Sequence, residues 1–464
     1  MKKYSRFIFD SFAFDPKSGK IELHYSLDDE VSFTETIILP VCESGTGAPD
    51  AELQHALFAL HLIGGISYYK TCLPKIIEIR SGSLTEKEAA FWTDVYENGL
   101  GEFFYKNDID FRGLIRFPAA DAPPPNPLPR GGGKEKMREG GKNGERNRGE
   151  VLVPIGGGKD SIVTAELLKK AGKDVTLLRV GHHPLINEVA KIAGLPLLTV
   201  ERHLSPALFD LNAAGALNGH VPITAYLSIL SVIIAMTEGF EAVVWSNERS
   251  ASEGNVTVHG KEINHQWSKS MAFEKSFSEY LAESIGTNIA SFSLLRPWSE
   301  LRIVREFTKF PQYFGAFTSC NKNWKILSKP LSPTLSRGER GKPLWCCCCP
   351  KCAFAFLLLA AFLPEKTIIE IFGKNLFEDE ALLPLYRELL GLTGIKPFEC
   401  VGTPEECQAA FFLAQEKGEW EQTAAMKIFM KESAPSVKDS KKLIERELSA
   451  SGDHMIPEEY NPSR

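Results

Sequence analysis

Apolar and polar residues alternate along the first forty residues of the chain. Residues 21–26 and 31–39 show this period of two, and turn residues separate the two stretches. A period of two is typical of half-buried antiparallel strands. The beginning of the chain is therefore predicted to be rich in β-structure.

The period then changes to that of helices. Leu53, Leu57 and Leu60 have helical spacing, and residues 83–96 predict a second helix with Ser83 as its N-cap. Together with the strands, these helices predict a small α+β domain over residues 1–118.

Short apolar strands alternate with helices in the middle of the chain. Strands of this kind, separated by helices, predict a parallel sheet covered on both faces, which is a doubly wound α/β fold. We assign this domain to residues 151–327 and expect its ligands at the carboxyl ends of the strands. The expected strands are 151–155, 175–180, 195–200 and 242–245, and the expected helices are 161–171, 184–193 and 222–237.

Two segments of low complexity interrupt this pattern. Residues 119–150 and 328–343 both run from prolines into Gly, Arg, Lys and Glu with few apolar side chains. Such segments are predicted to be solvated linkers, because balanced Glu content and the lack of aromatic residues disfavour basic arms for RNA. Residues 344–430 are expected to form a cysteine-rich knuckle and a mainly helical region, and residues 431–464 a charged tail.

Composition narrows the classes of function. The 464 residues carry a net charge of -6, which gives no broad positive field for nucleic acid. The longest apolar runs are shorter than the roughly 18 residues that cross a bilayer, and an early Asp10 interrupts any signal peptide. We therefore expect a cytoplasmic protein that binds neither nucleic acid nor membrane. Its oligomeric state stays open.

A glycine-rich loop joins the first strand of the α/β domain to a helix. Backbone N–H groups and the helix dipole converge at such a junction and favour an anion. The loop has neither Walker nor Rossmann spacing, and a turn without a ligand is the plainer alternative. The predicted anion-binding residues are Gly156, Gly157, Gly158, Lys159, Asp160 and Ser161. Replacing Lys159 or Asp160 with Ala is expected to stop turnover and leave the fold intact, because neither belongs to an apolar helix face.

Five of the ten cysteines crowd into residues 346–352. The spacing Cys346-x2-Cys349-x2-Cys352 suits a tetrahedral metal knuckle, and Cys320 could supply the fourth thiolate. A structural Zn²⁺ is the first expectation. Free or reactive thiols and an iron-sulfur cluster are the alternatives.

The glycine-rich loop resembles the Ser-Gly-Gly-x-Asp-Ser signature of the PP-loop ATP pyrophosphatases, with Gly156 in place of the first Ser. The resemblance implies that ATP and Mg²⁺ bind at this loop and that AMP and pyrophosphate are released. The cysteine spacing is also similar to the zinc site of 7-cyano-7-deazaguanine synthase, another PP-loop enzyme.

Several other segments together resemble the ATP-dependent UDP-N-acetylmuramoyl-L-alanyl-L-glutamate epimerases of bacterial peptidoglycan synthesis. The resemblance covers about residues 5–410 without the two low-complexity segments. It implies that the terminal L-glutamate of UDP-MurNAc-L-Ala-L-Glu, a small-molecule substrate, is inverted to D-glutamate through an acyl-adenylate. The segments that carry the resemblance are residues 65–70, 211–224, 246–252, 264–270, 345–352 and 396–402.

Chemistry explains why such an inversion would consume ATP. Removing the α-proton beside a free carboxylate would place two negative charges on adjacent atoms, whereas an adenylated carboxyl withdraws electrons and lets a side-chain base act. We expect His220 or Glu248 as the base, with His265 and Cys320 as alternatives, each of which could also be a purely structural residue. Lys159 and Asp160 are expected to assist catalysis at the loop. The predicted substrate-binding residues are Asn247, Arg249, His265 and Lys269, and Arg296 could be a further anion clamp.

Two other functions fit the same sequence. A PP-loop ligase or thiolase that modifies a nucleobase or tRNA would also use a cysteine knuckle, although the acidic balance opposes it. An ATP-binding regulatory module would bind ATP and release no pyrophosphate.

Overall fold

The computed structural model describes residues 2–40, 50–120, 150–324 and 344–461. The predicted linkers at 119–150 and 328–343 therefore lie almost entirely outside the described residues. Among the described residues, no helix is both long and apolar enough to cross a membrane.

The described strands form one large sheet with the order β11-β8-β5-β6-β7-β3-β2-β1-β4 and a separate small hairpin of β9 and β10. The strands are β1 (Arg6–Asp15), β2 (Lys20–Leu27), β3 (Val31–Ile38), β4 (Ile76–Ile79), β5 (Glu150–Pro154), β6 (Asp174–Val180), β7 (Leu197–His203), β8 (Ala242–Trp245), β9 (Val256–Val258), β10 (Lys261–Ile263) and β11 (Ala290–Ser293).

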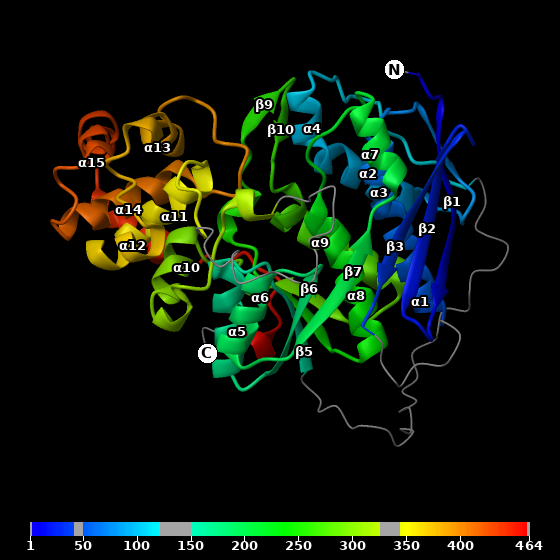
Figure 1. Cartoon of the computed structure of the whole chain (residues 1–464), viewed down its shortest axis with the longest axis horizontal. Helices are drawn as coiled ribbons and strands as arrows, with labels where there is room; N and C mark the ends of the chain where they lie inside the picture. The colour runs from blue at the N-terminus through cyan, green and yellow to red at the C-terminus, as the bar shows by residue number, and fades with distance from the viewer. Residues whose placement is uncertain (1, 41–49, 121–149, 325–343, 462–464) are drawn as a thin grey trace.

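The N-terminal strands continue the sheet of the α/β region. β3 pairs antiparallel with β7, with Thr36 opposite His203, while β11, β8, β5, β6 and β7 are parallel neighbours. Figure 1 shows the N-terminal strands in blue beside the green strands of the middle of the chain. The first 118 residues thus share a mixed, mostly parallel sheet with the α/β region.

Helices cover both faces of the parallel strands, as the sequence predicts. Side chains in β5 alternate between two cores, with Val151 and Val153 in one and Leu152 in the other. The first core contains α5, α6 and the C-terminal helices, and the second contains α1, α3 and α8. The helices up to the end of the α/β region are α1 (Ala51–Gly64), α2 (Ile66–Tyr69), α3 (Glu86–Gly99), α4 (Gly101–Lys106), α5 (Lys159–Lys170), α6 (Pro184–Ala193), α7 (Pro206–Ala213), α8 (Ile223–Glu238), α9 (Met271–Tyr280) and α10 (Glu300–Phe307).

The C-terminal region is mainly helical and lies at the opposite end of the molecule from the blue strands (Figure 1). Its last helix belongs to the part predicted as a charged tail, where Leu443 and Glu447 are buried. The helices are α11 (Pro350–Ala360), α12 (Glu365–Phe372), α13 (Leu383–Leu389), α14 (Pro404–Glu416), α15 (Ala424–Ile428) and α16 (Ser440–Leu448).

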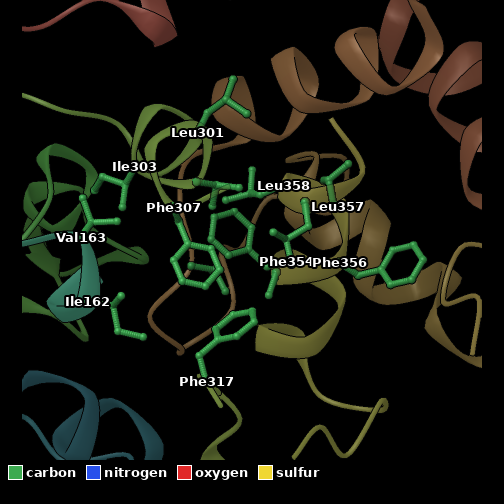
Figure 2. Packing of buried hydrophobic residues seen from close by; sticks show 14 of the residues in the cluster. Ile162, Val163, Leu301, Ile303, Phe307, Phe317, Phe354, Phe356, Leu357 and Leu358 are labelled. Carbon is green, nitrogen blue, oxygen red and sulfur yellow. The ribbon is translucent and has the colours of Figure 1, made fainter. Parts of the chain in front are cut away.

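Aromatic packing joins the C-terminal helices to the α/β region. Figure 2 shows Ile162 and Val163 of α5, Phe307 of α10 and Phe354 of α11 gathered in one cluster. The ring centroids of Phe307 and Phe317 are 4.5 Å apart. Burying side chains of this size stabilises the fold by about 2 kcal/mol each, so α5 and the loop before it are held firmly against the C-terminal helices.

One predicted helix start is wrong by two residues. α3 begins at Glu86 and is capped by Thr85, whose side chain and that of Glu88 form a reciprocal capping box. Ser83 with Glu86 and Thr85 with Glu88 are both capping-box pairs in the sequence, so the sequence does not distinguish them, and the structure uses the second pair.

Candidate functional site

A large cavity of about 1420 Å³ opens at the carboxyl ends of β5 and β8. In the sheet, β6 and β7 lie on one side of β5, whereas β8 and β11 lie on its other side. The crevice between β5 and β8 is therefore the switch point where doubly wound sheets bind ligands. Lining residues come from three parts of the chain, including Lys70 before the α/β region and Lys351 after it.

The glycine-rich loop forms one wall of this cavity. Gly157 has a φ of 75°, a left-handed conformation that favours glycine. α5 follows with Gly158 as its N-cap and no capping side chain. The N–H groups of its first turn are thus left to a ligand, which is the arrangement that binds phosphate.

Lys159 is deeply buried, which the sequence did not indicate. Its Nζ lies 2.6 Å from Oδ1 of Asp160 and also pairs with Glu300 at the start of α10. Burial alone would lower the pKa of Lys159, but the two carboxylates outweigh it and raise that pKa. Because Lys159→Ala would strand the buried carboxylate of Glu300, the structure leads us to expect that this substitution destabilises the fold, in contrast to the expectation from the sequence.

The loop after β8 is held by a buried arginine. Arg296 donates to the backbone oxygen of Glu248 at 2.7 Å, to that of Lys269 at 2.6 Å and to the carboxylate of Glu274 at 2.7 Å. Arg296 is therefore a positioning residue rather than an anion clamp. The side chain of Asn247 beside it donates to Ser293 at 3.0 Å.

Glu248 projects into the cavity beside the phosphate loop. Only 4% of it is exposed, and this burial raises the pKa of its carboxyl above the usual value. The neighbouring Lys269 ammonium opposes that shift. A carboxyl group with a raised pKa is suited to proton transfer near neutral pH.

His220 and His265 both line the cavity, and Glu102 lies behind them. Nδ1 of His265 hydrogen-bonds to the carboxylate of Glu102, and Nδ1 of His220 lies 3.4 Å from it. Burial favours the neutral form of His265, but its hydrogen bonds to Cys400 and Glu102 raise its pKa to about 9. Burial and the charge of His265 lower the pKa of His220 to about 4. His265 is thus held protonated and His220 neutral.

Lys269 and Cys400 both line the cavity and contact each other. The Nζ of Lys269 lies 3.6 Å from the Sγ of Cys400. Burial would raise the pKa of Cys400, yet Lys269, Lys351 and His265 outweigh burial and hold it well below the usual value. These three cationic side chains therefore favour the thiolate form of Cys400.

Most of the residues predicted from the sequence come together at this cavity. Gly157 belongs to the same loop but does not line the space. Arg249 is not brought in, because its Nη2 pairs with Glu447 of α16 at 2.6 Å. Those that line the cavity are Gly156, Gly158, Lys159, Asp160, Ser161, His220, Asn247, Glu248, His265 and Lys269.

Sequence reasoning missed cavity residues that lie outside the α/β region. Lys70 and Cys400 belong to segments 65–70 and 396–402, which carry the family resemblance. The sequence therefore marked these segments as unusual but did not assign a role to either residue. Burial lowers the pKa of Lys70 to about 8. Within the α/β region, no motif pointed to Glu300, which lines the cavity, and none pointed to Glu102, which contacts the cavity residue His265.

The four predicted metal ligands are brought together close to the glycine-rich loop. Sulfur atoms of Cys320, Cys346, Cys349 and Cys352 all lie within 4.8 Å of one another. Cys346 and Cys352 are separated by 3.7 Å and Cys349 and Cys352 by 3.5 Å. Tetrahedral zinc with Zn–S bonds of about 2.3 Å separates its sulfurs by roughly 3.8 Å, so the donor set fits zinc.

The two remaining thiols of this run do not belong to that group of four. Cys347 is buried and donates to the backbone oxygen of Phe372 at 3.2 Å. Cys348 is exposed, and its sulfur lies 3.0 Å from the ammonium of Lys322 and 3.6 Å from the sulfur of Cys346. Cys348 thus touches one sulfur of the group, while the four others all lie close to one another.

This sheet and cavity define a doubly wound α/β protein that gathers ionisable side chains at the switch point of its sheet. Two family models match the chain, the MurL N-terminal domain over residues 1–294 and the MurL C-terminal domain over residues 316–444. The chain therefore belongs to the MurL family.

Curated relatives extend the match over nearly the whole chain. A protein of Xanthomonas oryzae pv. oryzae is 39% identical over 98% of this chain and 95% of its own. One from a Micromonospora species is 38% identical over 99% of this chain and 98% of its own, and one from Salinispora tropica is 39% identical over 90% and 87%. Each of the three is named UDP-N-acetyl-alpha-D-muramoyl-L-alanyl-L-glutamate epimerase.

Proposed function

We propose that this protein inverts the terminal L-glutamate of UDP-MurNAc-L-Ala-L-Glu to D-glutamate in peptidoglycan synthesis, through an acyl-adenylate that consumes ATP and releases AMP and pyrophosphate. The observation that carries the proposal is a single cavity that places a helix N-terminus suited to phosphate beside buried groups suited to proton transfer. The shared name of three relatives supports the substrate. Use of ATP would place the reaction in the cytoplasm.

The size of the cavity supports two large ligands. Sites for one small molecule usually enclose about 300 to 1,000 Å³, whereas this cavity measures about 1420 Å³. ATP would lie at the glycine-rich loop, as in the PP-loop enzymes that this loop resembles. The muramoyl dipeptide would then extend toward Lys70 and His220.

The first step joins the substrate to AMP. The α-carboxylate oxygen of the glutamate attacks the α-phosphorus of ATP, the bond to the β-phosphate breaks, and pyrophosphate leaves. N–H groups of the loop and of the first turn of α5 would stabilise the charge on the phosphates. Lys269 would neutralise the carboxylate and phosphate that meet beside it. Mg²⁺ bound to ATP would supply further charge neutralisation, and Asp160 of the glycine-rich loop, whose carboxylate lines the cavity, would hold it.

Adenylation prepares the α-carbon for inversion. The acyl-phosphate anhydride withdraws electrons, so a base can take the α-proton and the planar carbanion can be protonated on its other face. Water then hydrolyses the anhydride and releases AMP. Zn²⁺ held by Cys320, Cys346, Cys349 and Cys352 would have a structural role outside this chemistry.

The test combines purified protein with ATP, Mg²⁺ and UDP-MurNAc-L-Ala-L-Glu. We expect one AMP and one pyrophosphate for each D-glutamate found by chiral analysis after hydrolysis. Pyrophosphate release that requires a nucleobase or tRNA would instead identify the ligase or thiolase. Binding of ATP without pyrophosphate release under any of these conditions would identify a regulatory module.

A further inference from the structure

Cys400 lies in the segment between α13 and α14 and lines the cavity from the C-terminal side. Its sulfur is 3.6 Å from the ammonium of Lys269 and hydrogen-bonds to His265. Cys400 is not one of the four clustered cysteines that are candidate metal ligands. The thiol is therefore a reactive group of the cavity that the steps above leave unused.

The position of Lys269 connects Cys400 to the loop that would bind ATP. The carboxylates of Glu248 and Asp160 and the sulfur of Cys400 all act on the Lys269 ammonium and raise its pKa. The Lys269 ammonium thus interacts both with Asp160 of the glycine-rich loop and with Cys400. The α-carbon of a glutamate whose carboxyl is held by Lys269 would then lie near the sulfur of Cys400, which is 3.6 Å from the same ammonium.

We propose that the thiolate of Cys400 is the base that removes the α-proton of the adenylated glutamate. This inference rests on the proposed epimerisation and names a catalytic residue for it. The Cα–H bond breaks, the proton forms an S–H bond with Cys400, and the electron pair moves onto the acyl oxygen. A second acid of the cavity, resupplied from water, protonates Cα on the opposite face.

Charged groups from every side of Cys400 favour its ionised form. Lys269 and His265 face it from the segment before α9, and Lys351 faces it from α11. Glu399 precedes it in the chain, and burial raises the pKa of its carboxyl. Glu102 affects Cys400 indirectly, because its hydrogen bond with His265 raises the pKa of that histidine.

The two bases expected from the sequence are less suited to this step. His220 is engaged by Glu102, whose carboxylate lies 3.4 Å from its Nδ1. Glu248 interacts with Asp160 and Lys159 of the glycine-rich loop, where ATP would bind. Cys400 lines the cavity and lies 3.6 Å from Lys269, the ammonium that would hold the reacting carboxyl.

The test separates adenylation from proton transfer in the full-length enzyme. Wild type, Cys400→Ser and Cys400→Ala are given ATP, Mg²⁺ and UDP-MurNAc-L-Ala-L-Glu in D₂O. Pyrophosphate release, α-deuterium incorporation and D-glutamate are measured. Cys72→Ser is the matched control, because Cys72 is partly buried but does not line the cavity.

We expect both Cys400 variants to retain pyrophosphate release within a few-fold and to lose α-exchange and D-glutamate by at least ~100-fold. The control should match wild type. Exchange at the wild-type rate in either folded variant overturns the proposal, and so does an equal loss of pyrophosphate release and exchange. A wild type that forms no D-glutamate would refute the proposed function itself.

A second measurement uses only the wild-type protein, so it does not require any variant to fold. Iodoacetamide alkylation of Cys400 and Cys72 is followed by peptide mass spectrometry between pH 7 and 9. The rate at Cys72, whose pKa is raised by burial, should rise about tenfold per pH unit. The rate at Cys400 should change less than about twofold. A tenfold rise per unit at Cys400 would overturn its assignment as a thiolate.

Discussion

The backbone N–H of Thr318 donates a hydrogen bond to the carbonyl oxygen of Gly157 at 3.0 Å. The hydroxyl of Thr318 accepts from the N–H of Cys320 at 3.1 Å and donates to the backbone oxygen of Leu344 at 2.7 Å. One residue thus ties the glycine-rich loop to both chain segments that carry the clustered cysteines. The order of that loop should depend on the cysteine cluster.

Zinc removal should therefore weaken ATP binding as well as stability. We expect about one zinc per chain and its loss in the double variant Cys349→Ser with Cys352→Ser, because both sulfurs belong to the close cluster. Elemental analysis gives the metal content, thermal melting gives the stability, and calorimetry gives the affinity for ATP. All three quantities should fall together.

Cys348→Ser is the control for that experiment. Cys348 belongs to the same run of cysteines but is exposed, with its sulfur beside Lys322. This variant should keep its zinc and its melting temperature. Wild-type protein without metal, or a double variant that melts like wild type, would contradict a structural zinc.

Removing the buried charge of Lys159 should destabilise the protein. Lys159→Ala leaves Glu300 without its partner, and breaking a buried pair typically costs roughly 3–5 kcal/mol. The double variant Lys159→Met with Glu300→Gln removes both charges and should recover most of that stability. Urea unfolding measures the free energies.

Catalysis should not return with stability in the double variant. Lys159 also pairs with Asp160, so its loss frees a carboxylate at the phosphate loop. Pyrophosphate release should stay abolished. Wild-type turnover in the double variant would show that Lys159 serves the fold alone.

Acid should weaken the fold through His61. This residue is fully buried, and burial lowers its pKa from 6.5 to about 4, while its ring nitrogens face Ser81 and the backbone of His24. Between these two values the unfolded chain takes up a proton before the folded one does. The titration of His61 therefore leaves the free energy of unfolding unchanged above pH 6.5 and lowers it as the pH drops toward 4.

The size of this effect can be isolated in His61→Gln. From pH 7 to 5, His61 should account for about 2 kcal/mol of lost stability. His220 acts in the same direction, so the measured quantity is the difference in pH slope between wild type and variant. The variant should be less stable at pH 7 but show the shallower slope. Parallel slopes would mean that His61 titrates normally in the folded protein.

Local patterns predict the parts of this fold whose causes are local. α6 and β8 begin and end at the residues expected from periodicity and from their Pro and Gly boundaries. The glycine-rich loop and the loop after β8 meet because carboxyl ends of parallel strands share one edge. Residues 156–161 and 247–248 could thus be assigned to one site from the sequence.

Contacts between distant segments could not be predicted in this way. Pairing of β3 with β7 joins the N-terminal strands to the parallel sheet, and no repeat or motif encodes it. The partner of Lys159, Glu300, is 141 residues away. Cys400 comes from a third part of the chain. The lowering of its pKa depends on Lys269 and His265, which only the folded structure brings close to it.

Adenylation before proton transfer is the step on which the proposed function depends. It is tested by α-deuterium incorporation into the glutamate of UDP-MurNAc-L-Ala-L-Glu in D₂O with ATP, with no nucleotide, or with an analogue blocked between the α- and β-phosphates. We predict deuterium at the α-carbon with ATP, and none without nucleotide or with the analogue blocked between the α- and β-phosphates, because that analogue cannot transfer AMP to the carboxylate. An analogue blocked only between the β- and γ-phosphates should support exchange. Equal deuterium incorporation without nucleotide would contradict the mechanism and indicate direct racemisation.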